Sequence, residues 1–209
     1  MKKIYKLILP LILILTLSSC AYSEPDAKFT VTALGFSEEK NTVNAYLQAI
    51  DFATTENGNI NTFLTQGEGD NIPLALSNIK SKLSKAPSFE HCQIVFLSDG
   101  IEGELLKHTL DCLVRLGMSQ RVTLAYTKNI EDALSSGKIT SGNEMVSLIK
   151  QNAKEWGFGG HTALFEIKTA VLENGGNFAL CHIETKNEEI KFSGLAEYKG
   201  SQKKKTFKP

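Results

Sequence analysis

A short apolar run at residues 93–97 constrains the fold more than any other stretch. It reads Gln-Ile-Val-Phe-Leu, without the polar alternation of a half-buried strand. Unbroken runs of β-branched and aromatic residues are typical of a strand that is covered on both faces. We therefore expect residues 93–98 to form a strand near the middle of a sheet.

The sequence after this run predicts a turn, a helix and a second parallel strand. Gly100 can adopt the positive φ of a tight turn, and Asp99, three residues before Glu102, fits the capping pattern of a helix start. A capping role for Asp99 is favoured over ligand contact at the carboxyl end of the strand. Leucine and valine then recur every three or four residues as far as Gly117, where a helix commonly ends. The apolar run at 122–126 completes a unit of the size of one right-handed crossover.

The other segments extend this unit to a domain of the α/β (mixed α+β) class. Its expected elements are a central mixed sheet with at least three parallel strands (62–66, 93–98, 122–126), crossover helices at 71–83 and 102–116, an N-terminal hairpin (29–36, 42–52), three further helices (129–136, 144–155, 162–172) and a C-terminal hairpin (178–184, 190–198). The hairpins should flank the parallel strands.

Charge is unevenly distributed along a chain whose formal net charge is zero. Residues 1–19 and residues 199–209 contain lysines but no acidic residues. Residues 20–198 therefore contain 15 basic and 23 acidic residues, a net charge of −8. A body this acidic does not favour nucleic acid, which binds positively charged surfaces. With 42% hydrophobic residues, the chain has the core content of one globular domain.

The amino terminus carries the most specific signal, a lipoprotein signal peptide over residues 1–19. A basic start, Met1-Lys2-Lys3, precedes an apolar stretch from Leu7 to Leu17 that is too short to span a bilayer as a helix. It closes on Leu17-Ser18-Ser19-Cys20, which matches the bacterial lipobox. We expect the Cys20 thiol to take fatty acyl chains such as palmitate, which anchor the mature protein to the outer face of the cell membrane.

These observations divide the chain into four parts. Residues 20–27 are expected to form a short tether, residues 28–199 a single globular domain, and residues 200–209 a solvated basic tail. The lysines of that tail could instead touch anionic lipid, at about 1 kcal/mol per residue near a surface.

Cysteine and histidine are the first candidates for chemistry in the body of the chain. They occur as His91-Cys92 and Cys181-His182, with His108 four residues before Cys112. Neighbours on a strand point to opposite faces, so each adjacent pair can offer only one ligand to a shared zinc site. Buried thiols are therefore favoured over a metal site, a reactive thiol, or one disulfide from Cys92 to Cys112 or Cys181.

Motifs of the common catalytic and nucleotide sites are missing. Gly67-Glu68-Gly69-Asp70 has no lysine or threonine and carries two acids, which would repel a phosphate. The sequence has no Gly-x-Ser-x-Gly elbow, no His-Glu-x-x-His and no pair of catalytic acids. It therefore predicts no catalytic residue, no metal and no cofactor.

Several segments resemble the Ger(x)C spore germination lipoproteins, the C subunits of nutrient germinant receptors. The matching segments are the lipobox at Cys20, the extended stretch Val31–Phe36 with the charged hairpin after it, the helix of Leu74–Leu83, Ser88–Phe96 and the closing strand Phe192–Lys199. The resemblance covers most of residues 17–199, the first domain of that family, which usually continues into two more. The residues after Cys20, Ala21-Tyr22-Ser23, differ from the family's Trp-Asp start.

The resemblance implies a noncatalytic receptor component, tethered to the spore inner membrane through Cys20 and working with integral-membrane A and B subunits. Two other classes share parts of the pattern. A lipid-tethered solute-binding or envelope assembly protein should bind its ligand without partner subunits. An extracytoplasmic hydrolase or thiol enzyme should lose activity, but not folding, on Cys92→Ser or His161→Ala.

Overall fold

The computed structural model describes residues 27–52, 61–135, 142–155, 163–172, 176–186 and 189–207. Its elements are β1 (Lys28–Glu39), β2 (Thr42–Asp51), β3 (Asn61–Gly69), α2 (Ile72–Lys80), β4 (Ala86–Ser88), β5 (Ile94–Leu97), α3 (Gly103–Arg115), β6 (Thr123–Thr127), α4 (Ile130–Ser135), α5 (Gly142–Glu155), α6 (Leu164–Leu172), β7 (Asn177–Lys186), β8 (Glu189–Lys199) and β9 (Gln202–Phe207).

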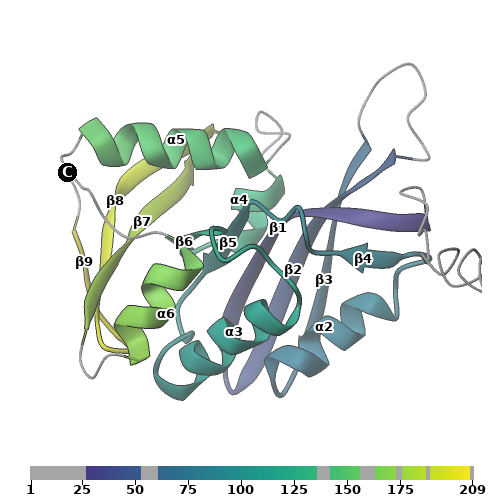
Figure 1. Ribbon diagram of the computed structural model, residues 1–209, viewed down its shortest axis with the longest axis horizontal. Coiled ribbons are helices and arrows are strands. Elements are labelled where there is room, and N and C mark those ends of the chain that lie inside the picture. Colours follow the sequence, from purple (N-terminus) through teal and green to yellow (C-terminus); the bar gives the residue numbers. More distant parts are fainter. Residues whose placement is uncertain are drawn as a thin grey trace, which may run out of the picture.

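One mixed sheet runs through the molecule in the order β3-β2-β1-β5-β6-β7-β8-β9, and β4 pairs with the start of β1. The pairs β1–β5, β5–β6 and β6–β7 are parallel, whereas β1–β2, β2–β3, β7–β8 and β8–β9 are antiparallel. Both expected hairpins are therefore present, and each continues the parallel centre of the sheet outward. The strands twist along the long axis of the molecule, with β3 and β4 toward one end and β8 and β9 at the other (Figure 1).

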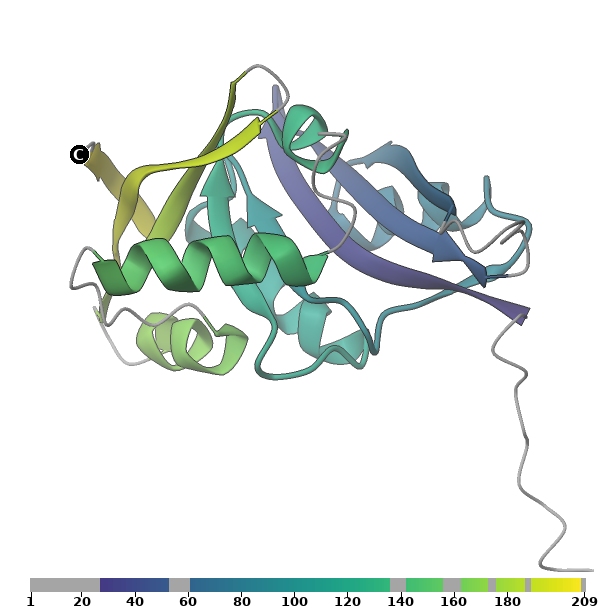
Figure 2. The ribbon, with the colours of Figure 1, turned by 90° about the horizontal axis from the view of Figure 1, so that it is seen from above.

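Helices cover both faces of this sheet (Figures 1 and 2). Apolar side chains of α2, α3 and α6 share one core with the sheet, and those of α4 and α5 share the other. In β5, Val95 and Leu97 belong to the first core, while Ile94 and Phe96 belong to the second, and all four are fully buried. The central, doubly covered strand that the apolar run predicts is confirmed.

The strand at 62–66 exists, but its place in the sheet differs from the expectation. β3 runs in the same direction as β5 and β6, yet its only strand partner among the described residues is β2, which is antiparallel to it. The N-terminal hairpin lies between β3 and β5, because β1 pairs with β5 on one side and with β2 on the other. The parallel centre of the sheet is thus β1, β5, β6 and β7.

The lysine-rich segment after Lys199 is a strand, in contrast to the expected solvated tail outside the domain. β9 pairs with β8 from Lys199↔Gln202 to Leu195↔Phe207. A composition rich in lysine suggests solvent, but only alternate side chains of a strand need to face it. Here Lys204 and Lys205 are exposed, while Lys203 turns inward.

Close contacts between elements explain the glycines at 67 and 69. A Cβ added at Gly67 would lie 2.4 Å from the Ala75 carbonyl oxygen, and one at Gly69 would lie 2.6 Å from the Ala75 nitrogen. The pair therefore lets α2 pack directly on the backbone of β3, which is a structural role.

Candidate functional site

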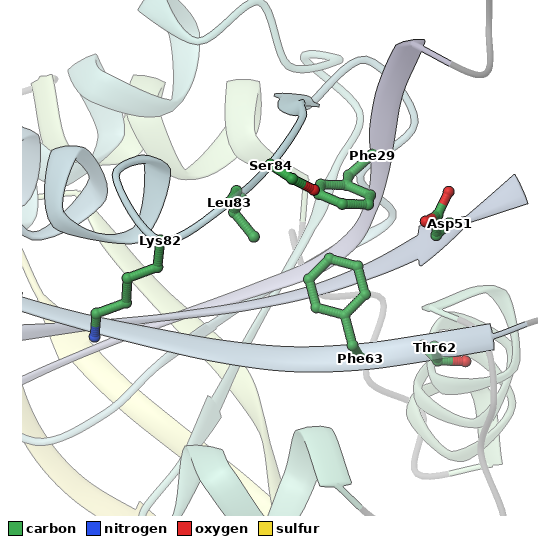
Figure 3. A pocket seen from close by; sticks show the side chains of 7 residues that line it. All are labelled: Phe29, Asp51, Thr62, Phe63, Lys82, Leu83 and Ser84. Carbon is green, nitrogen blue, oxygen red and sulfur yellow. The ribbon is translucent and has the colours of Figure 1, made fainter. Parts of the chain in front are cut away.

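A pocket lies at the end of the sheet where β1 begins, β2 ends and β3 begins, which we call the Lys28 end. Its volume is about 320 Å³, and its lining is Phe29, Asp51, Thr62, Phe63, Lys82, Leu83 and Ser84. Figure 3 shows the two aromatic rings next to each other, with Leu83 across from them and the Lys82 side chain pointing away from the rings. The rings of Phe29 and Phe63 meet edge to face, with 4.8 Å between their centroids. The wall is aromatic and aliphatic, whereas the rim is charged.

Charges at the Lys28 end are only partly balanced. Lys85 Nζ lies 2.8 Å from Asp51 Oδ1 and 5.4 Å from the centre of the Phe29 ring, so these two charges offset each other beside the pocket. Lys82 is exposed and donates a hydrogen bond to the Gln66 carbonyl oxygen at 2.8 Å, which leaves its charge in place. Lys28, next to the pocket on β1, is also exposed. Beside the pocket, the charges of Asp51 and Lys85 are thus paired, whereas Lys28 and Lys82 are exposed to solvent.

A second polar cluster joins Asp99, Tyr126 and Lys203. The Tyr126 hydroxyl donates to Asp99 Oδ1 at 2.7 Å, and Lys203 Nζ donates to both the Tyr126 oxygen, at 2.7 Å, and Asp99 Oδ1. The same ammonium lies 4.2 Å from the centre of the Tyr126 ring. The cluster therefore links β9 to the carboxyl ends of β5 and β6.

The expected capping role of Asp99 is wrong. The N-cap of α3 is Glu102, whose side chain makes no capping hydrogen bond, and the Asp99 carboxylate is turned to Tyr126 and Lys203. Glu102 instead accepts a hydrogen bond from the Lys203 backbone nitrogen at 3.2 Å. The predicted turn is present, with Gly100 at a φ of +85°.

Burial and hydrogen bonding shift the pKa values of this cluster. Desolvation raises the pKa of the Asp99 carboxyl, but the hydrogen bonds and charge of Lys203 and the hydroxyl of Tyr126 outweigh it, so the pKa lies below its ordinary value. Desolvation, and then the bond to Asp99, raises the pKa of Tyr126. Near neutral pH the Asp99 carboxyl is therefore ionised and the Tyr126 phenol is protonated, so that the phenol can donate to the carboxylate.

The three cysteines of the body are free thiols. Burial raises the pKa of Cys92 to about 12 and that of Cys181 to about 11. The pKa of the half-buried Cys112 is also raised by desolvation. High pKa values keep a thiol protonated and unreactive at neutral pH. The buried-thiol interpretation is therefore confirmed for Cys92 and Cys181.

The structure does not bring the histidine–cysteine pairs together. His91 and His108 are exposed, whereas His182 is 1% exposed, lies 3.7 Å from Glu184 Oε1 and packs on Tyr126. Cys181 belongs to the core on the opposite face of the sheet. In the described part of the chain, no three histidine, cysteine, aspartate or glutamate side chains are grouped to hold a metal ion.

Two groups of predicted site residues lie outside the described residues. They are the lipobox, Leu17, Ser18, Ser19 and Cys20, and His161. Of the helices in the described ranges, none has the length and hydropathy needed to cross a membrane.

Sequence reasoning missed the Phe29 pocket and the Lys203 cluster. Each joins residues that are far apart in the chain, Phe29 with Leu83 in one and Asp99 with Lys203 in the other. The spacing of apolar residues reports which side of an element is buried but not which elements meet.

Comparisons with known proteins identify one family. The model of that family, described as "Spore germination protein N-terminal domain", matches residues 22–185, which is most of the chain. Among solved structures, "Crystal Structure of the GerBC protein" is similar at 15% sequence identity and a TM-score of 0.38, over 81% of this chain and 49% of that one. The chain thus spans about half the length of the GerBC chain. No curated protein matches.

Proposed function

Because the chain belongs to the family of spore germination proteins that share this N-terminal domain, we propose that it is a lipid-anchored, noncatalytic C subunit of a germinant receptor. The observation that carries the proposal is the match over residues 22–185, which begins two residues after the lipobox cysteine. It agrees with the resemblance to the Ger(x)C proteins that the segments between Cys20 and Lys199 indicate.

Anchoring through Cys20 is supported by the sequence of the leader. Leu17, Ser18 and Ser19 supply one branched apolar and two small residues before the cysteine, and three lysines with no acid precede them. Two or more acyl chains hold a protein on a membrane far more firmly than one, because each buried methylene contributes about 0.8 kcal/mol. The protein would then remain on the extracytoplasmic face of the spore inner membrane.

A noncatalytic role is supported by the way the polar groups of the domain are used. Asp99, Tyr126 and Lys203 bond to one another and fix β9, and burial raises the pKa of the Cys92 thiol far above neutrality. A nucleophile needs an adjacent base or a lowered pKa. These groups therefore stabilise the fold, and the protein would act by contact with integral-membrane A and B subunits.

Intact mass spectrometry of the protein purified from spore membranes tests the anchor. We expect cleavage before Cys20 and the added mass of acyl chains. Cys20→Ala should leave the leader uncut and release the protein from acyl attachment, whereas Ser19→Ala keeps a small residue and should be processed normally. An unmodified Cys20 in the native protein would contradict the anchor.

Germination assays and copurification test the receptor role. Spores that carry Cys20→Ala should lose optical density more slowly with the nutrient of this receptor than spores with Ser19→Ala, while other receptors still respond. The tagged native protein should copurify with two multi-spanning membrane proteins. Normal germination of a deletion strain with every nutrient that the wild type answers would contradict the role.

A further inference from the structure

We propose that β9 is a strap that opens from β8 as one unit while the rest of the domain stays folded, and that Lys203 is the latch that holds it closed. Opening uncovers the loop that follows the central strand β5. The inference goes beyond the proposed receptor role and does not depend on the anchor at Cys20.

The first argument is that β9 takes no part in either core. The strand lies at the outer edge of the sheet (Figure 1). None of its six residues, all of which the structure describes, is buried, and neither apolar core includes one of them. Phe207 is 44% exposed, and the Lys205 ammonium lies 4.2 Å from the centre of its ring. Segments with little buried apolar surface open at a lower free energy than the whole domain.

The second argument is that polar bonds hold β9 at its beginning. The Gly103 nitrogen donates a hydrogen bond to the Ser201 carbonyl oxygen at 2.9 Å, and the Lys203 nitrogen donates to Glu102 Oε2 at 3.2 Å. The ammonium of the same lysine adds the bonds of the polar cluster. These bonds lie together at one end of the strand, so their loss frees the strap at a single point.

The third argument is a polar group that the closed strap leaves unsatisfied. Tyr198 pairs with Lys203 across the two strands and is fully buried. Its hydroxyl has no hydrogen-bond partner among the described residues. Burial raises the pKa of this hydroxyl, and the nearby Tyr126, Glu102 and Asp99 raise it further, which places it beside the latch. A buried hydroxyl without a hydrogen bond destabilises the state that buries it. Water that enters on opening therefore favours the open strap.

Opening changes which groups of the domain are accessible. The carboxylates of Asp99 and Glu102 lose their bonds to Lys203, and the Tyr126 ring loses the ammonium that covers it. These groups lie at the carboxyl ends of β5 and β6, and ligands commonly bind at this edge of open α/β sheets. The strap thus controls access to an acidic and aromatic surface, which is closed in this structure.

Amide hydrogen exchange of the purified protein, resolved by NMR in low concentrations of urea, tests the strap. Gly103 is the reporter, because its N–H bonds to Ser201 although the two residues are far apart in the chain. We expect the Gly103 amide and the β9 amides that pair with β8 to share one protection factor, at least about tenfold lower than that of β5. Its dependence on urea should be weak, because opening exposes little surface.

Three variants separate the strap from simple fraying. Lys203→Met should lower the protection of Gly103 and of β9 by the same factor, roughly 10- to 30-fold, and the control Lys204→Met by less than about twofold. Tyr198→Phe should raise it about threefold or more, since the closed strap then buries no unsatisfied hydroxyl. Equal urea dependence of β9 and β5 exchange would overturn the separate opening. Unchanged Gly103 protection in Lys203→Met, with faster exchange only toward Phe207, is fraying and would overturn the latch.

Discussion

Replacing Lys203 by methionine is expected to lower the free energy of unfolding by about 2 kcal/mol. The ion pair with Asp99 contributes at most about 1 kcal/mol, because the Asp99 side chain is 60% exposed and solvent screens the charges. The ammonium above the Tyr126 ring adds about 0.5–1 kcal/mol. The hydrogen bond to the Tyr126 oxygen adds up to about 1 kcal/mol. Methionine keeps most of the apolar stem, so the loss is confined to these polar terms.

Urea unfolding of the purified protein measures this change, and Lys204→Met is the matched control. Lys204 is an exposed neighbour on the same strand, so its substitution should change stability by less than about 0.5 kcal/mol. For a domain of this size the loss at Lys203 corresponds to a melting temperature lower by about 4–8 °C. Amide exchange in β9 should accelerate in Lys203→Met, because the cluster attaches this strand to β5 and β6.

The pH dependence follows from the lowered pKa of the Asp99 carboxyl. A carboxyl whose pKa is lower in the folded state stabilises the fold above its unfolded pKa of about 3.9, and this contribution is lost as the pH falls through the folded value. The stability difference between the wild type and Lys203→Met should therefore be constant near neutral pH and shrink below about pH 4. Equal stabilities of the two lysine variants at neutral pH, or a difference between the wild type and Lys203→Met that does not shrink in acid, would refute the role of the cluster.

Three other substitutions or measurements test the packing. Gly67→Ala should destabilise by about 1–3 kcal/mol in urea unfolding, because its methyl group would push α2 off β3; stability equal to the wild type would contradict the close packing. Gln48→Ala should cost about 1–3 kcal/mol, since the Gln48 amide donates to the buried Leu134 carbonyl oxygen at 2.7 Å, and an unchanged urea midpoint would show that this bond is dispensable. In native protein at pH 8, mass spectrometry should find a thiol reagent on Cys112 well before Cys92; equal rates would contradict the burial of Cys92.

The parts of the fold that the sequence predicted are those that local pattern determines. The run at 93–97 is apolar on both sides, so it required a layer of helices on each face, and the structure has both. The turn at Gly100 and the helix end at Gly117 needed positive φ, which glycine adopts most easily.

Strand order was not predictable in the same way. β1 lies between β2 and β5, and nothing in its own sequence reports its partners. Gln48 shows the same limit, because a polar side chain that alternates with apolar neighbours on a strand normally faces solvent, while packing of α4 on β2 buries Gln48 to 4% exposure. Periodicity describes an element, whereas burial of a polar side chain depends on which element covers it.

The two edges of the sheet are protected by different means, and this bears on how the domain can meet partners. At the β3 edge, Asn78 and Lys82 of the helix and its following turn donate to the carbonyl oxygens of Glu68 and Gln66. At the other edge, β9 carries three consecutive lysines, two of them exposed. Capped carbonyls and edge lysines both oppose the addition of a strand from another chain.

That protection matters most for a protein held on a surface. Anchoring confines molecules to a thin layer and raises their effective concentration, so an open sheet edge would promote pairing between neighbouring copies. Contacts with the proposed membrane subunits should then involve helix faces or loops rather than strand addition. A β9 edge made apolar by Lys204→Val with Lys205→Val should therefore associate in light scattering of the reconstituted protein, whereas the same two exposed positions changed to glutamate should stay monomeric. Monomers in both cases would show that the edge lysines have no such role.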